Sequence, residues 1–190
     1  MPTTFSPRTA GNLAIASVVL FVAALVALAL FFGGVGDFWG PINDVTIAVS
    51  LLLVIPVIWA VDGFTWPTVG IWLTVIGWAA VLGILLAAGG QLMLVIGVVP
   101  LETTFATFGI GALPYLAWIL ALSWVALQAD VLPRGIGWWG VGFLAVAAVS
   151  LLIAPLLPVS SATLTVLLGG PLTVAYSGWL LGLAGFLRAS

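Results

Sequence analysis

Six apolar stretches, each about as long as a helix must be to cross a membrane, dominate this sequence. Charged residues make up 4% of the 190-residue chain and hydrophobic residues 64%. A soluble domain usually has about 25% charged residues, and so few charges cannot cover a globule of this size in water. We therefore expect an all-α, polytopic membrane bundle of about six transmembrane helices, forming a single domain over residues 1–190. The predicted spans are 13–32, 45–61, 69–88, 105–127, 138–157 and 166–187.

Three missing residue types exclude much of the chemistry that membrane proteins perform. The chain has no cysteine and no histidine, and its three cationic side chains are all arginines. Thiolate chemistry, histidine-ligated metals and histidine general bases are therefore excluded, as are Schiff bases on lysine. We expect no catalytic residue, no metal site and no cofactor held by side chains of this chain. Bound lipid is expected.

The first apolar stretch has two interpretations. A secretory signal peptide has an apolar region of about 7 to 15 residues, followed by a cleavage site of small residues. Here the apolar run extends from Leu13 to Phe32, and Gly33 and Gly34 follow two phenylalanines. This pattern favours a retained helix over a cleaved signal.

Polar residues predict where the second span begins and ends. Asn43 and Asp44 occupy the position of a helix N-cap, where a side-chain oxygen accepts from a free backbone amide. The segment 62–67 contains Asp, Gly and Pro and predicts the turn into the third span.

The third apolar region is too long for one simple span. A helix over residues 69–99 would measure about 46 Å, whereas the hydrocarbon core is about 30 Å thick. We expect a break at Gly89 and Gly90, which would leave Leu92 to Val99 as an interfacial or re-entrant piece.

The arginines predict the orientation. With six spans, Arg8, Arg134 and Arg188 all lie on one side of the membrane. The positive-inside rule assigns that side to the cytoplasm, so both termini are expected there, in a prokaryotic cytoplasmic (inner) membrane.

Every charged residue lies outside the predicted spans. Because ionisable groups within a membrane usually mark ion paths or proton relays, their absence argues against pumps, ion exchangers and intramembrane aspartic proteases. Hydroxyl groups do remain inside the spans. They either hydrogen-bond within the bundle, which we favour, or line a path for a neutral solute. The main candidates are Ser17, Ser50, Thr74, Ser123, Ser150, Thr173, Tyr176 and Ser177.

Small residues recur on one face of two predicted helices. Steps of three and four residues bring such positions onto one face, where they let two helix backbones approach closely. In the sixth span this stripe consists of Pro171, Ala175, Gly178, Gly182 and Gly185. In the third span it consists of Ala80, Gly83, Ala87 and Gly90. Contacts within the chain are favoured over contacts with another subunit, and both remain open.

Two segments carry a resemblance to a known family. They are the turn and helix start VLPRGIGWWG at 131–140 and the helix segment YSGWLLG at 176–182. From Phe105 onward, the chain resembles a family of uncharacterised bacterial multi-spanning membrane proteins, known only as a domain of unknown function. The resemblance implies about six helices and transfers no reaction and no site residues.

The expected function is therefore non-catalytic. We expect an accessory or scaffolding subunit that packs within a larger membrane complex, with the lipid bilayer and other membrane subunits as partners and no role for nucleic acid. An alternative is a small carrier or channel for a neutral or apolar solute. A weaker alternative is a protein that contacts lipid or pigment through its aromatic faces.

Overall fold

The computed structural model describes residues 6–153, 156–157, 163 and 165–190. Six helices in this part of the chain are long and apolar enough to cross a membrane. They are α1 (Pro7–Phe32), α2 (Trp39–Val69), α3 (Ile71–Val95), α4 (Leu101–Gln128), α5 (Arg134–Ile153) and α7 (Gly170–Ala189). A short π-helix, η2 (Thr165–Gly169), leads into α7, and the described residues contain no strand. The prediction of an all-α chain with six such helices is confirmed.

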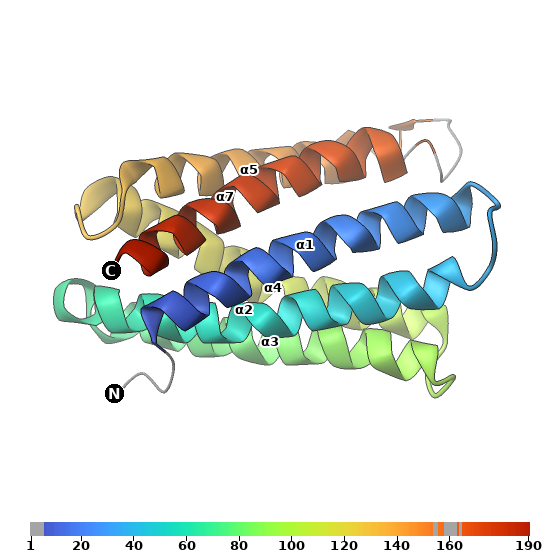
Figure 1. Cartoon of the computed structure of the whole chain (residues 1–190), viewed down its shortest axis with the longest axis horizontal. Helices are drawn as coiled ribbons and strands as arrows, with labels where there is room; N and C mark the ends of the chain where they lie inside the picture. The colour runs from blue at the N-terminus through green and yellow to red at the C-terminus, as the bar shows by residue number, and fades with distance from the viewer. Residues whose placement is uncertain (1–5, 154–155, 158–162, 164) are drawn as a thin grey trace.

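The six helices form a closed ring. Each helix packs against the next one along the chain, and α7 packs against both α5 and α1 (Figure 1). Residues from all six helices contribute to one cluster of buried side chains. The first and last helices therefore close the bundle, and its interior is shared by the whole chain.

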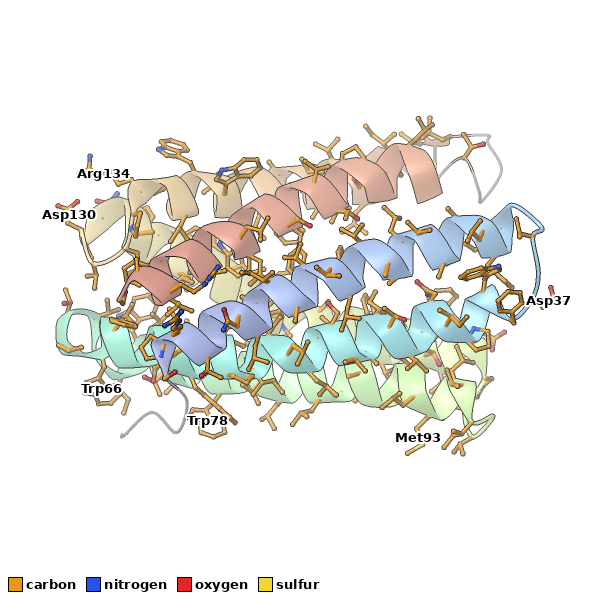
Figure 2. The ribbon with its side chains drawn as sticks, in the orientation of Figure 1. Asp37, Trp66, Trp78, Met93, Asp130 and Arg134 are labelled. Atoms are coloured by element: carbon orange, nitrogen blue, oxygen red, sulfur yellow. The ribbon has the colours of Figure 1, made fainter. Side chains whose placement is uncertain are left out.

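The two ends of the bundle differ in charge. Arg8 is in the first turn of α1 and Arg188 is in the last turn of α7, so both lie at the end of the bundle where α1 begins and α7 ends (Figure 1). Arg134 is at this same end, whereas Asp37 is at the opposite one (Figure 2). Glu102, in the first turn of α4, shares the end of Asp37. We call these the arginine end and the acidic end.

The start of α2 differs from the prediction. The helix begins at Trp39, so Asn43 and Asp44 lie in its second turn and do not cap it. Their side chains instead bond to each other, because the Asn43 amide Nδ2 donates to Asp44 Oδ1 at 3.0 Å. The prediction of an N-cap at these two residues is wrong.

The predicted turn at 62–67 is also helical. The α2 helix continues through it to Val69, and the chain reverses at Gly70, which has a φ of 77° and follows the helix directly. Thr74 Oγ1 of α3 donates to Asp62 Oδ1 at 2.5 Å, which gives this carboxylate a partner across the turn. Glycine adopts this left-handed φ without a steric cost, so one residue is enough to connect α2 to α3.

The α3 helix has no break at Gly89 and Gly90. It runs through both glycines to Val95, and the turn comes at Gly97, with a φ of 73°. Leu92 to Val95 are therefore part of α3, which contradicts the predicted separate piece at 92–99. Two glycines cost a helix about 1 kcal/mol each relative to alanine. At Gly90 the absence of a side chain lets α4 pack closely, because this glycine provides room for the Thr107 side chain, whereas an added Cβ at Gly89 would meet nothing within 4 Å.

Candidate functional site

Among the described residues, the charged side chains form one ion pair, between Arg134 and Asp130. The residues that the structure describes contain no group of three or more histidine, cysteine, aspartate or glutamate side chains that could hold a metal. Arg134 Nη2 lies 3.3 Å from Asp130 Oδ1, and both side chains are more than two-thirds exposed. Such an exposed pair contributes about 0–1 kcal/mol to stability, so it is a surface feature of the turn before α5.

Aromatic rings fill the middle of the ring of helices. We call Phe21, Tyr115, Trp118, Phe143, Tyr176 and Trp179 the central aromatic cluster. Trp118 and Trp179 meet edge to face with centroids 5.8 Å apart, and both are almost completely buried. Edge-to-face contact is a favoured geometry for aromatic rings. The cluster joins α1, α4, α5 and α7.

A hydrogen bond crosses this cluster. The hydroxyl oxygens of Tyr115 on α4 and Tyr176 on α7 lie 3.0 Å apart, and both side chains are buried. Because α5 separates α4 from α7 in the ring, this bond joins helices that are not ring neighbours. Tyr176 was among the candidate polar residues of the sequence, whereas Tyr115 was missed. One feature of the sequence could have suggested this pairing, since Tyr115 and Tyr176 are the chain's only two tyrosines.

A second polar contact joins α1 to α2. Ser17 Oγ donates to the backbone carbonyl of Ser50 at 2.9 Å, and Ser50 Oγ donates to the carbonyl of Ser17 at the same distance. Both serines are fully buried. Ser123 on α4 bonds back to the Ile119 carbonyl of its own helix at 2.7 Å. These three hydroxyls hydrogen-bond within the bundle.

Some buried polar atoms have no hydrogen-bond partner in the structure. Trp179 Nε1 and Ser177 Oγ are two of them, both on α7. A Cβ added at Gly140 of α5 would lie 3.1 Å from Trp179 Nε1 and would overlap Ser123 Oγ. Gly140, which sequence reasoning missed as a packing residue, therefore lets α4, α5 and α7 meet at the cluster.

The small-residue stripe of α7 faces α5 over part of its length. Ala175 is buried, and a Cβ added at Gly178 would lie 2.7 Å from the Trp139 ring. A Cβ at Gly182 would make an ordinary contact, 3.5 Å from Ile136 Cγ1, and one at Gly185 would meet nothing within 4 Å. Close packing within the chain is therefore centred on Gly178.

The stripe of α3 faces α4. A Cβ added at Gly83 would overlap the Gly111 carbonyl oxygen, and one added at Gly111 would overlap the Gly83 carbonyl oxygen. Ala87 lies beside Gly111, and Ala80 is fully buried. Here two helix backbones touch, which only glycine at both positions allows. Gly111 was not recognised from the sequence.

The outer surface has an apolar groove between α3 and the start of α4. It has a volume of about 260 Å³ and is lined almost entirely by apolar atoms. Its lining residues are Leu85, Leu86, Gly89, Gly90, Met93, Val99, Thr103 and Thr107. Met93 lies near the acidic end, away from Arg134 (Figure 2). The groove is therefore an external feature, separate from the central aromatic cluster.

The two segments that carry the family resemblance pack against each other in space. Trp139 lies against Gly178, and Gly140 lies against Trp179. No protein-family model, curated protein or solved structure matches this chain. The geometry of the bundle is therefore the basis for a functional proposal.

Proposed function

We propose that the protein is a non-catalytic integral membrane protein of a prokaryotic cytoplasmic membrane, and that it packs as an accessory or scaffolding subunit in a larger membrane complex. The observation that carries this proposal is the occupied interior of the helix ring. Trp118, Trp179, Leu122 and Leu183 fill its centre and are at most 1% exposed. A bundle filled by its own side chains acts through its outer surface.

The buried polar groups support a non-catalytic role. Among the described residues, those that are polar and buried are serines, threonines and one asparagine, with no carboxylate or arginine among them. General acid–base catalysis and proton relays need titratable groups near the reacting atoms. The two buried tyrosines bond to each other, which occupies their hydroxyls in packing.

The spacing of two aspartates supports membrane insertion. Asp44 and Asp62 are 18 positions apart on the continuous helix α2, which corresponds to about 27 Å of helix rise. The hydrocarbon core of a bilayer is about 30 Å thick, so both carboxylates would lie at its boundaries. The three arginines lie at one end, and the positive-inside rule supports our assignment of that end, with both termini, to the cytoplasm.

Gentle extraction tests the accessory role. The protein is extracted from native membranes in mild detergent, sized under native conditions, and its co-purifying proteins are identified by mass spectrometry. A stoichiometric protein partner is expected. A protein that runs alone, as a monomer or a homo-oligomer, would contradict the accessory role.

A carrier for a neutral solute is the second candidate. The hydroxyls of Ser17, Ser50, Tyr115 and Tyr176 are the observation in its favour, since all four are buried inside the ring. A solute path would require the central aromatic cluster to separate. Uptake of neutral solutes into liposomes that contain the purified chain tests this candidate. Transport that is lost in Tyr176→Phe would favour it over the accessory role.

A further inference from the structure

The exposed tryptophans all lie toward one end of the bundle. Six of the chain's ten tryptophans are more than 40% exposed, and each is within seven residues of the arginine-end terminus of its helix, about 10 Å along the axis. Figure 2 shows two of them, Trp66 and Trp78, on the same side of the molecule as Arg134 and away from Met93. We call the six the tryptophan belt: Trp66 on α2, Trp72 and Trp78 on α3, Trp124 on α4, and Trp138 and Trp139 on α5.

The belt extends around the bundle instead of covering one side of it. Its members come from four consecutive helices of the ring, α2 to α5. The other two helices each have an exposed arginine at the same end, Arg8 on α1 and Arg188 on α7. Every helix of the ring therefore presents an indole or a guanidinium group at this end. A single protein partner would cover one side of such a ring, whereas the interface of a bilayer surrounds it.

The acidic end has a different set of aromatic side chains. Trp39 is the one tryptophan there, and it is partly buried, with its ring centroid 4.7 Å from that of Phe38. The exposed aromatic residues at that end are phenylalanines: Phe31, Phe32, Phe38 and Phe105. Phenylalanine has no polar group, whereas the N–H of an indole favours the headgroup level of a bilayer. The two ends therefore differ in their affinity for a headgroup region.

The belt lies outside the proposed hydrocarbon core. Asp62 is seven residues before Val69, the last residue of α2, and so marks the inner limit of the belt. In the proposed membrane orientation this carboxylate is at the boundary of the hydrocarbon core, and the headgroup region beyond it is about 5–8 Å thick. The belt is therefore at the level of the headgroups of the cytoplasmic leaflet.

We propose that the tryptophan belt anchors the protein in the headgroup region of the cytoplasmic leaflet and sets its depth in the bilayer from that side alone. Indole N–H groups donate there to lipid carbonyl and phosphate oxygens, and Arg8 and Arg188 pair with phosphates. This inference rests on the proposed membrane orientation. It goes beyond the accessory role, because the anchor would act with or without a protein partner.

Bilayer thickness separates anchoring at one end from equal matching at both ends. Because the chain has no cysteine, a spin label can be attached to one introduced cysteine, and power-saturation EPR then measures its depth in liposomes that contain the purified full chain. Val75→Cys and Phe105→Cys form a matched pair at opposite ends. Each position is four residues into its helix, α3 or α4, and each side chain is at least 60% exposed. Two phosphatidylcholines provide hydrocarbon cores of about 27 Å and about 32 Å.

In the thicker bilayer, the label at position 75 should keep its depth below its own interface. The label at position 105 should move about 5 Å deeper below the opposite interface, because the bundle follows only the anchored leaflet. The double variant Trp124→Leu/Trp138→Leu removes the two most exposed indoles of the belt. In that variant the label at position 75 should also move deeper, by about 2 Å, since the change is then shared between the two ends. Phe32→Leu/Phe38→Leu is the matched control at the acidic end and should behave as the unmodified chain does.

Several results would overturn the proposal. In the unmodified chain these are equal movement of the two labels, movement of neither, or movement of the label at position 75 alone. A tryptophan double variant that behaves like the phenylalanine double variant is another. Loss of a co-purifying protein in the tryptophan double variant, with unchanged label depths, would instead identify the belt as a protein-docking surface. Full access of water-soluble relaxation agents to both labels would overturn membrane insertion itself, and with it the proposed function.

Discussion

Tyr115 and Tyr176, 61 positions apart in the sequence, meet in the middle of the bundle with their hydroxyl oxygens 3.0 Å apart. Each ring also contacts a neighbouring tryptophan, Trp118 for Tyr115 and Trp179 for Tyr176. The bond links two helices that α5 separates in the ring. The contact therefore forms only when α4, α5 and α7 are all packed together in the ring.

Replacing Tyr176 with phenylalanine should destabilise the protein. Tyr176→Phe leaves the Tyr115 hydroxyl buried without this partner, which costs about 1–3 kcal/mol. Reversible unfolding in mixed micelles measures the change. The double variant Tyr115→Phe/Tyr176→Phe should lose less than the sum of the two single losses, because it removes both hydroxyls. Additive losses would show that the two hydroxyls do not interact.

The contact between Gly83 and Gly111 should be intolerant of any side chain. Gly83→Ala places a methyl group against the Gly111 backbone and forces α3 and α4 apart. We expect a loss of about 1–3 kcal/mol, as is typical of overpacking. Gly109→Ala adds the same methyl group where no atom lies within 4 Å, so its unfolding curve should match or exceed that of the unmodified chain. Equal destabilisation by both changes would contradict this packing.

The two glycines of the GxxxG pair on α7 should respond differently to leucine. Gly178→Leu places a branched side chain against the Trp139 ring and should reduce the melting temperature clearly. The Cβ of Gly182→Leu makes only an ordinary contact with Ile136, so this change should cost less. Thermal melts of the two variants in one detergent compare them directly. A larger loss at Gly182 than at Gly178 would contradict the described packing of α7 against α5.

The orientation can be tested with single cysteines, since the chain contains none. Cysteines placed at Thr9, Gly135 and Ala189 should react with a membrane-impermeant reagent only from the cytoplasmic face. A cysteine at Gly36, in the turn between α1 and α2, should react only from outside. Labelling of positions 36 and 135 from the same face would contradict the proposed topology.

The apolar runs were sufficient to predict the number and type of the helices, because a span needs a length of apolar residues and little else. The helix ends were harder to predict. Asp62 resembled a turn residue in the sequence, whereas in the structure it is part of α2 and accepts a hydrogen bond from Thr74 of the neighbouring helix. Likewise, Asn43 and Asp44 bond to each other within the helix, which no capping rule anticipates.

The packing residues were predicted in part. Small residues at steps of three and four identified Gly83 as part of a packing face on α3, and Gly178 as part of one on α7. Their partners, Gly111 and Trp139, come from helices whose pairing and rotation the sequence does not specify. The groove beside Gly89 follows from the same pairing of α3 with α4, so it could not be predicted before that pairing was known.

The single-residue connection at Gly70 would constrain how the proposed membrane protein inserts into a bilayer. Because a single residue connects them, α2 and α3 would insert together as a helical hairpin and not one after the other. The short connection also fixes how α3 is rotated about its own axis, and so which of its residues face α4. Each residue of a helix turns it by about 100°, so one inserted residue that extended α3 at its start would swing Gly83 away from Gly111. The turn thus sets the phase of the third helix as well as its direction.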